Sequence, residues 1–202
     1  MPDIQFIREA ILALQTCPIK NSGVRPVMPV GDGSSGIMLI GEAPGAKEDE
    51  IGEPFVGASG RLLNNIMLPS VGLTRETIYL TNIVKCRPPE NRDPKQEEKD
   101  AWTPILELEV DTIKPNLVVC LGRHSMGYFL PKAKISEVHG QIQTVILGNG
   151  KKINLLPLYH PAAALYNPNM LETLKSDFLI IKPFLEKVEE IKAKMLAQSS
   201  VL

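Results

Sequence analysis

The sequence predicts an α/β domain built on a mainly parallel β-sheet. Short apolar runs of strand length recur along the chain, and amphipathic segments of helical period separate them. The chain has 202 residues, of which 44% are hydrophobic and 22% charged, as is usual for a folded protein with one sizeable core. We therefore expect a single domain over residues 1–202.

The first half of the chain predicts two helices and two strands. Residues 3–16 carry isoleucine and leucine at helical spacing, which predicts an amphipathic helix. After a link rich in glycine and proline, the apolar run at residues 37–40 predicts a buried strand. Ser59 is placed to cap a following helix, and residues 78–84 predict a second strand.

The second half continues this alternation of strands and helices. Residues 95–113 predict a helix, in which Pro104 implies a late start or a kink. The apolar run at residues 117–121 predicts a third buried strand. Residues 141–158 alternate around a Gly-Asn-Gly turn, which is typical of a hairpin, and a long helix is expected from about Leu171.

Composition and charge narrow the class of protein. No apolar run approaches the roughly 18 residues needed to span a bilayer, and no signal-peptide pattern opens the chain. The three cysteines are an odd number with wide spacing, which argues against a disulfide framework and favours a cytoplasmic protein. The net charge of −1 lacks the basic excess common in nucleic-acid-binding proteins, so any DNA contact must come from a local basic patch.

Unusual loops follow three of the expected strands. Ligands of open α/β sheets bind outside the carboxyl ends of the strands, so we expect these loops to form one site. The first loop lacks the Gly-Lys-Ser/Thr of a phosphate-binding loop and the spacing of a dinucleotide fingerprint. It could be a solvated turn, and its Phe55 could belong to the core. Asn82 and His160, near the ends of later strands, could each be structural or could bind a ligand.

Three motifs in these loops together resemble those of the family 4 uracil-DNA glycosylases. They are GEAPGAKEDEIGEPFVG at residues 41–57, TNIVKCRPPENR at residues 81–92 and YHPAAALYNP at residues 159–168, in the family's order and at similar separations. The resemblance extends over residues 12–170. It implies a three-layer α/β/α sandwich around a mainly parallel sheet of about four strands. It also implies hydrolysis of the N-glycosidic bond of a flipped uracil in DNA, which leaves an abasic site.

The resemblance assigns roles to the residues that would hold the base. Phe55 would stack on the flipped uracil, and the Asn82 amide would accept from N3–H and donate to O4. A neutral His160 would donate a hydrogen bond to O2. Backbone amides from Glu42 to Gly45, including that of Ala43, suit the negative charge that develops on the departing base.

Three carboxylates match the acidic positions of the family. Glu42, Glu48 and Asp49 are the candidates for orienting the water and stabilising the cation-like sugar. The motif alone leaves open which of them acts on the water. Ala43 stands where the family 1 enzymes carry their catalytic aspartate.

The resemblance also predicts how the chain contacts DNA. Lys85, Arg87 and Arg92 follow the second strand and would supply positive charge for phosphate groups. Leu165 or Tyr166, after the His-Pro dipeptide, would enter the minor groove as a wedge. We expect a monomer that acts on uracil-containing DNA in the cytoplasm or nucleoid, with no membrane partner.

The cysteines depart from the family pattern. Family members hold a 4Fe–4S cluster with four cysteines. Cys17 and Cys86 match two of them, whereas Leu14 and Ala101 occupy the other two positions. We therefore expect no metal or cluster, and apolar packing by Leu14 and Trp102 in its place.

Two other functions remain open at this point. One is a glycosylase for another deaminated base, hypoxanthine or xanthine, although a purine would need a roomier pocket than Asn82 favours. The other is a catalytically silent DNA-binding relative, which the missing cysteines suggest.

Overall fold

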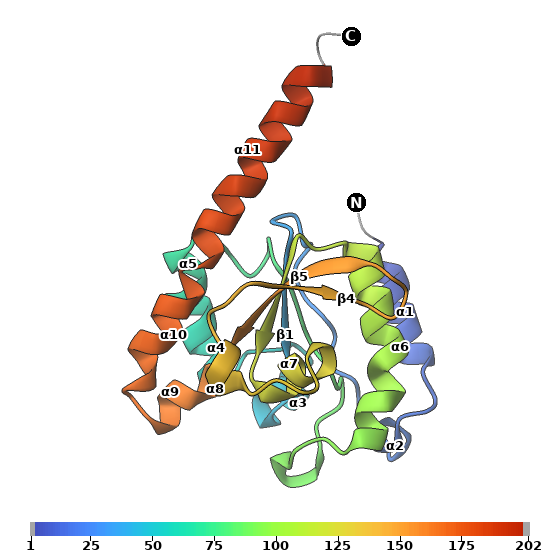
Figure 1. The fold of residues 1–202 in the computed structure, drawn as a ribbon. Coiled ribbons are helices and arrows are strands. Elements are labelled where there is room, and N and C mark those ends of the chain that lie inside the picture. The colour runs from blue at the N-terminus through green and yellow to red at the C-terminus, as the bar shows by residue number, and fades with distance from the viewer. Residues whose placement is uncertain (1–2, 200–202) are drawn as a thin grey trace.

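The computed structural model describes residues 3–199 and shows a central sheet between two layers of helices (Figure 1). The sheet has five strands in the order β2-β1-β3-β5-β4. Their bounds are β1 Ile37–Gly41, β2 Tyr79–Asn82, β3 Leu117–Leu121, β4 Gln143–Ile146 and β5 Lys152–Leu158. The first four in the spatial order are parallel, and β4 pairs antiparallel to β5 at the edge. The expected mainly parallel sheet of about four strands is confirmed, and it has five.

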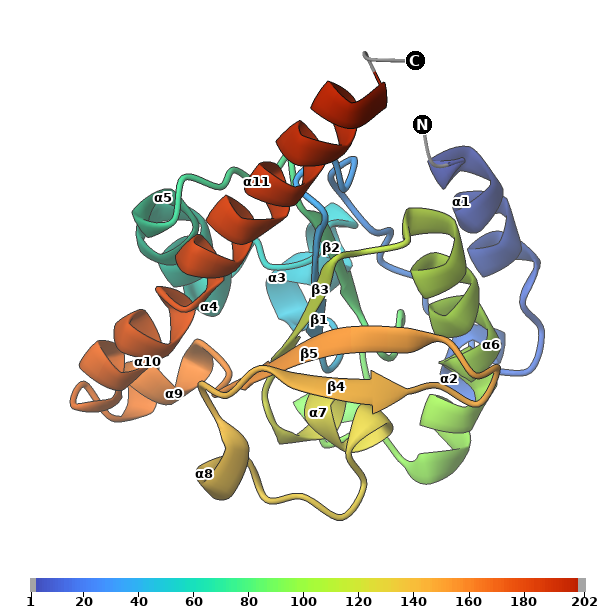
Figure 2. The same cartoon turned by 45° about the horizontal axis from the view of Figure 1, so that its top comes forward.

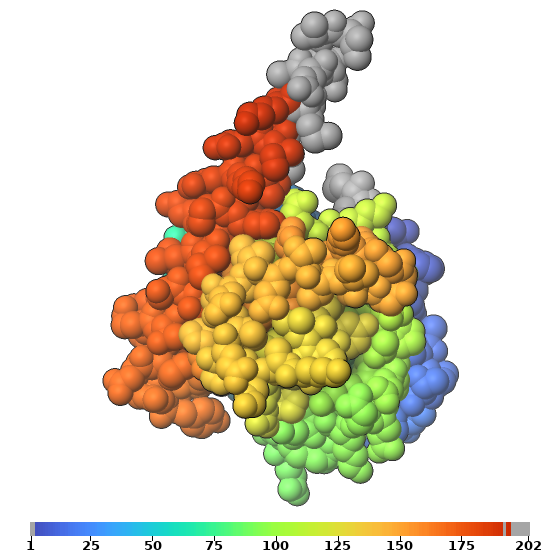
Figure 3. All heavy atoms as spheres, in the orientation of Figure 1, coloured from blue at the N-terminus to red at the C-terminus, as the bar shows by residue number. Residues whose placement is uncertain are grey.

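The two helical layers are made by segments that alternate with the strands. Their bounds are α1 Ile4–Ala13, α2 Pro18–Asn21, α3 Ala46–Ile51, α4 Ala58–Leu62, η1 Leu63–Met67, α5 Leu68–Ser70, η2 Pro89–Asn91, α6 Gln96–Ile113, α7 Arg123–Phe129, α8 Ile135–Val138, α9 Ala162–Tyr166, α10 Met170–Phe178 and α11 Ile181–Ser199. Helices α1 and α6 cover one face of the sheet, whereas α4, α5 and α10 cover the other (Figures 1 and 2). Helix α11 projects away from the rest of the fold (Figure 3).

Each face of the sheet has its own apolar core because successive strand residues point to opposite sides. In β1, Met38 and Ile40 pack with the α1 and α6 side, whereas Ile37 and Leu39 pack with the α4 and α10 side. Strands β1, β2 and β3 are buried along their whole length. Such burial on both faces explains why β1 and β3 are continuous apolar runs without alternation, whereas β2 ends in the buried polar residues Thr81 and Asn82.

Several expected boundaries shift in the structure. Helix α6 starts at Gln96 and continues through Pro104, so the proline does not delay its start. Gly57, not Ser59, is the N-cap of α4, and no side chain caps that helix. The long helix expected from Leu171 is divided into α10 and α11. Among residues 3–199, no helix is both long and apolar enough to cross a lipid bilayer.

Candidate active site

A cavity of about 440 Å³ opens at the carboxyl edge of the sheet, where the loops after β1, β2 and β5 meet. The three motifs thus converge on one place, as the parallel topology predicts. The residues that line the cavity are Glu42, Ala43, Pro44, Gly45, Glu48, Phe55, Ser59, Asn82, Pro88, Asn91, Arg92, Asp93, His160, Ala162 and Tyr166.

Phe55 forms a flat wall of this cavity in a strained backbone conformation. Its φ of 54° lies in the left-handed region, which costs of order 1–3 kcal/mol for such a residue and marks functional sites. Its ring stacks against that of His160, with 5.6 Å between centroids and 29° between planes. Gly60 allows this arrangement, because a Cβ there would lie 1.9 Å from the Phe55 carbonyl oxygen.

Asn82 presents a free amide to the cavity. The residue is only 4% exposed and ends strand β2. Its side-chain amide makes no hydrogen bond with any residue in the described part of the chain, although buried amides are normally paired. Gly41 leaves the space beside it, since a Cβ there would come within 2.3 Å of the Asn82 Oδ1. An amide that opens on a cavity without a protein partner is suited to pair with a ligand that offers one donor and one acceptor.

His160 is neutral and is held in one tautomer. Burial lowers its pKa to about 4, although the Glu48 carboxylate opposes this effect. The backbone N–H of Ala162 donates to Nδ1 at 3.2 Å. Nδ1 is therefore an acceptor, and the single ring proton lies on Nε2. The imidazole can thus donate a hydrogen bond without carrying a positive charge.

The three candidate carboxylates occupy different environments. Glu48 is 8% exposed, and its Oε1 accepts the backbone N–H groups of Val56 and Gly57 at 2.9 and 2.7 Å. It therefore holds the Pro-Phe-Val-Gly turn. Asp49 is not among the cavity-lining residues, and its Oδ2 lies 3.7 Å from Arg87. Only Glu42 lines the cavity without a strong hydrogen bond to the protein.

Glu42 is kept partly protonated by its surroundings. Burial raises its pKa from 4.5 to about 7, and the nearby Asp93 charge adds to the rise. Lys99 and Arg123 oppose it. A carboxyl group with a pKa near neutrality is suited to accept a proton from water.

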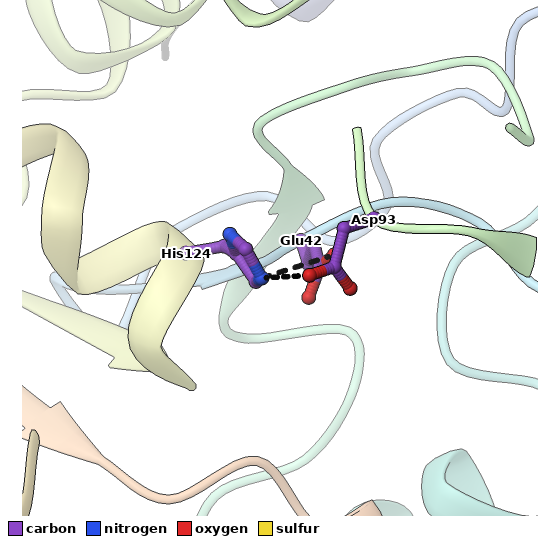
Figure 4. A group of neighbouring side chains, drawn as sticks. All are labelled: Glu42, Asp93 and His124. Atoms are coloured by element: carbon purple, nitrogen blue, oxygen red, sulfur yellow. Dashed lines mark ion pairs between the residues drawn. The ribbon is translucent and has the colours of Figure 1, made fainter. Parts of the chain in front are cut away.

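Asp93, from the loop after η2, and His124, from the first turn of α7, converge on Glu42 (Figure 4). His124 Nε2 lies 3.2 Å from Asp93 Oδ2 and 3.7 Å from Glu42 Oε1. The three ligand atoms lie within 4.8 Å of one another, as in a metal site. However, Lys99 Nζ lies 3.4 Å from His124 Nδ1, and Arg123 bonds Asp93 at 2.8 Å. These two cations balance the two carboxylates, so the cluster offers little attraction to a divalent ion.

Sequence reasoning missed Asp93 and His124 as members of the site. Asp93 lies in the loop after the second motif, so its strand-end position was the available signal. His124 is the second residue of α7, just after β3, but a lone histidine carries little information without its neighbours.

The structure corrects the expected role of Lys85. Its side chain is 1% exposed, and its ammonium lies 2.7 Å from Glu109 Oε2. Lys85 therefore points into the interior and does not face DNA. The hydrophilic character of lysine suggested a surface position, but its buried partner Glu109 stands on helix α6, far along the chain.

The other expected DNA contacts are accessible. Arg92 lines the cavity and forms a fork with Glu98 at 2.6 and 2.9 Å, and Arg87 is partly exposed beside Asp49. Leu165 and Tyr166 are 50% and 89% exposed on α9. Large apolar side chains that protrude beside a cavity are suited to insertion between bases.

The place where four cysteines would hold a cluster is filled by packed side chains. Cys17, Cys86 and Trp102 are all fully buried in one apolar cluster, with Leu14 and Ala101 packed against it. The Trp102 indole N–H donates to Cys17 Sγ at 3.1 Å. Two thiols beside a tryptophan do not supply the four thiolates that a 4Fe–4S cluster needs. Trp102 and Leu14 thus lie together in one apolar cluster with the two cysteines.

Comparison with known proteins identifies the family. Residues 28–182 match the uracil DNA glycosylase superfamily. The chain belongs to this superfamily. It is 41% identical over 187 residues to the type-4 uracil-DNA glycosylase of Sulfurisphaera tokodaii, covering 90% of this chain and 84% of that relative. It is also 42% identical over 183 residues to that of Archaeoglobus fulgidus, covering 88% and 91%, and 34% identical over 164 residues to that of Thermotoga maritima, covering 81% and 84%.

The resemblance to family 4 glycosylases is thereby confirmed. All three motifs lie within the matched superfamily region. Cys17 lies before it, and Cys86 and Ala101 lie inside it.

Proposed function

We propose that the chain is a monofunctional uracil-DNA glycosylase that removes uracil and leaves an abasic site. The observation that carries the proposal is the meeting of Phe55, Asn82 and His160 around one cavity, with the Asn82 amide unpaired. A flipped uracil would stack on Phe55. It would present N3–H and O4 to Asn82, and O2 to the Nε2–H of His160. Cytosine would leave both Asn82 groups unpaired, at about 1–3 kcal/mol per group.

The chemistry follows from the charges in the cavity. The N-glycosidic bond breaks with its electron pair going to uracil, and the sugar gains cationic character. The Nε2–H of neutral His160 stabilises the anion at O2, and the backbone amides of Ala43 and Gly45, two residues that line the same cavity, would add to this. Water then bonds to C1′ and gives its proton to Glu42, the carboxylate with a pKa near 7. Glu48 would contribute by holding the turn that carries Phe55. Asp49 would contribute by holding Arg87 beside the cavity.

The same proposal covers partners and organisation. Arg87 and Arg92 would contact phosphate groups, and Leu165 and Tyr166 would hold the duplex open. The chain would act as a single-domain monomer, residues 1–202, on uracil-containing DNA in the cytoplasm or nucleoid.

We also infer that the enzyme works without a 4Fe–4S cluster. The support is the buried contact of Trp102 with Cys17 where family members would hold iron. A Trp102→Ala variant should lose about 3–5 kcal/mol of stability, because the cavity it leaves has no other occupant. The visible spectrum and iron content of purified protein test the inference. Iron–sulfur absorbance with about four irons per chain would overturn it.

The experiment for the main proposal is excision from a labelled oligonucleotide with one uracil in U·G, U·A or single-stranded form. Alkali reveals the abasic sites. Asn82→Ala and His160→Ala should each lower excision sharply, with little change in folding or nonspecific DNA binding. Asn149→Ala, an exposed asparagine in the β4–β5 turn, is the matched control and should leave excision unchanged.

Parallel oligonucleotides with hypoxanthine or xanthine test the nearest alternative. Excision of those bases but not uracil would assign the pocket to a purine. DNA binding without excision of any base would indicate a silent relative.

A further inference from the structure

A buried ion pair lies directly beneath the strand that ends in Asn82. Lys85 and Glu109 are 1% and 0% exposed, and their charged groups are 2.7 Å apart. Lys85 follows β2, whereas Glu109 comes from the C-terminal half of α6. Burial lowers the pKa of Lys85, and the Glu109 carboxylate opposes this effect. The pair needs an explanation, because buried ion pairs seldom stabilise a fold more than apolar residues of similar size.

Each N–H of the ammonium has a partner. Lys85 Nζ donates to Thr81 Oγ1 at 2.8 Å, to the Asn82 backbone carbonyl at 2.6 Å and to Glu109 Oε2 at 2.7 Å. Glu109 Oε1 accepts the hydroxyl groups of Tyr79 and Thr81 at 3.2 and 2.9 Å. The network therefore joins α6 to the last residues of β2 through fully paired polar groups.

The bond to the Asn82 carbonyl occurs where the sheet offers no partner. β2 is an edge strand, and Leu80 pairs outward with Val30 through both of its backbone groups. Backbone groups two residues apart in a strand point to the same side, so the Asn82 carbonyl also points outward. The bridge at Val30 does not reach that far, because it is a single isolated pair. The Lys85 ammonium supplies the hydrogen bond to the Asn82 carbonyl that a neighbouring strand would otherwise donate.

The Asn82 side chain depends on this backbone anchor. Its amide makes no hydrogen bond with the described residues, so neighbouring side chains do not orient it by polar contacts. Its direction is therefore set by the backbone from which it departs. A misplacement of about 1 Å in such a group can lower a reaction rate by about 100-fold.

We propose that Lys85 and Glu109 are positioning residues, which hold the end of β2 so that the Asn82 amide meets the edge of the base. This inference rests on the proposed uracil excision. Lys85 would thus act from the interior of the protein by orienting Asn82, and would contact neither the DNA backbone nor the base.

Two variants perturb the network without touching the cavity. Glu109→Gln removes one charge and keeps the side-chain shape. Because it leaves the Lys85 ammonium unpaired, this variant risks unfolding. Thr81→Val keeps both charges and the volume, and removes one acceptor from Lys85 and one donor from Glu109. Glu107→Gln, an exposed glutamate on the same helix, is the matched control.

The decisive experiment is a double-mutant cycle with Asn82→Ala, measured as kcat/KM on the U·G oligonucleotide under conditions where urea titration shows each variant folded. Thr81→Val, and Glu109→Gln where it folds, should lower kcat/KM about 10- to 100-fold and weaken inhibition by free uracil. Binding to abasic DNA, which lacks the base, should stay within about twofold. In the Asn82→Ala background the same changes should cost less than about twofold.

Other outcomes separate the two proposals. Equal losses in both backgrounds, or full activity of folded Thr81→Val, would overturn the positioning role while uracil excision stands. A wild-type protein that excises no uracil would overturn the proposed function. The side-chain amide resonances of Asn82 then decide the positioning role: a shift in Thr81→Val but not in Glu107→Gln supports it, and no shift overturns it.

Discussion

Replacing Glu42 with glutamine should make the protein more stable above neutral pH while it stops excision. Burial and Asp93 raise the pKa of Glu42 from 4.5 to about 7. The folded state therefore holds its proton more tightly than the unfolded state. Well below pH 4.5 Glu42 is protonated in both states, so it does not lower the free energy of unfolding. As pH rises from 4.5 to about 7, the unfolded state releases the proton first, so stability falls and then levels off.

The size of this effect follows from the pKa shift. One unit corresponds to about 1.4 kcal/mol, so the ionised Glu42 lowers the free energy of unfolding by at most about 3 kcal/mol. Glutamine carries no charge at any pH and avoids this cost. Glu42→Gln should match the wild type near pH 4 and exceed it at pH 8 by about 2–3 kcal/mol. For a chain of this size, this difference raises the melting temperature by about 4–12 °C.

Urea denaturation of both proteins between pH 4 and 8 measures this difference directly. Glu50→Gln is the control, because Glu50 is an exposed partner of Lys47 and should bring no gain at any pH. A stability difference that does not change with pH would refute the reasoning, since it would show that Glu42 titrates normally. The excision rate of the wild type should fall about tenfold per pH unit below about 7, where Glu42 is protonated.

Three further outcomes are expected. Gly60→Ala should lower both stability in thermal melts and excision, because its Cβ would lie 1.9 Å from the Phe55 carbonyl oxygen. Gly127 has open space around it, so Gly127→Ala should change neither in the same assays. The His160 imidazole should titrate near pH 4 by NMR and add no second limb to the pH–rate profile between pH 5 and 9; a titration near 6.5 would contradict its burial. Tyr166→Ala should leave the melting temperature unchanged and reduce excision from duplex DNA more than from single strands, and equal reductions on both would argue against a wedge.

The sequence predicted the parts of this site that depend on local pattern. Phe55, Asn82 and His160 stand in motifs that directly follow strands, and parallel topology alone brings such positions to one edge. The roles of Glu48 and Lys85 depended on tertiary contacts. Glu48 turns inward to bind backbone amides, and Lys85 turns inward because Glu109, 24 residues further on, completes its pairing.

The sequence also did not predict contacts between residues that are far apart along the chain. Asp93 and His124 are 31 residues apart, and neither belongs to the three motifs. Asp93 raises the pKa of Glu42, and His124 lies beside both carboxylates, through distances of a few ångströms that no local pattern encodes. The absence of cysteine at positions 14 and 101 was visible in the sequence, and with it the need for another side chain to fill the space.

The order of strands in the sheet also bears on how the site comes into existence. β1, β2, β3 and β5 begin at residues 37, 79, 117 and 152, yet they lie side by side. Each pairing must close a long stretch of chain before its contacts stabilise anything, which slows folding. Phe55 and His160 are far apart in the sequence, and their rings stack only when β1 and β5 have both joined the sheet. A folding intermediate that lacks β5 therefore lacks a complete pocket. Recovery of excision during refolding should therefore lag behind the return of helical signal and coincide with docking of β5.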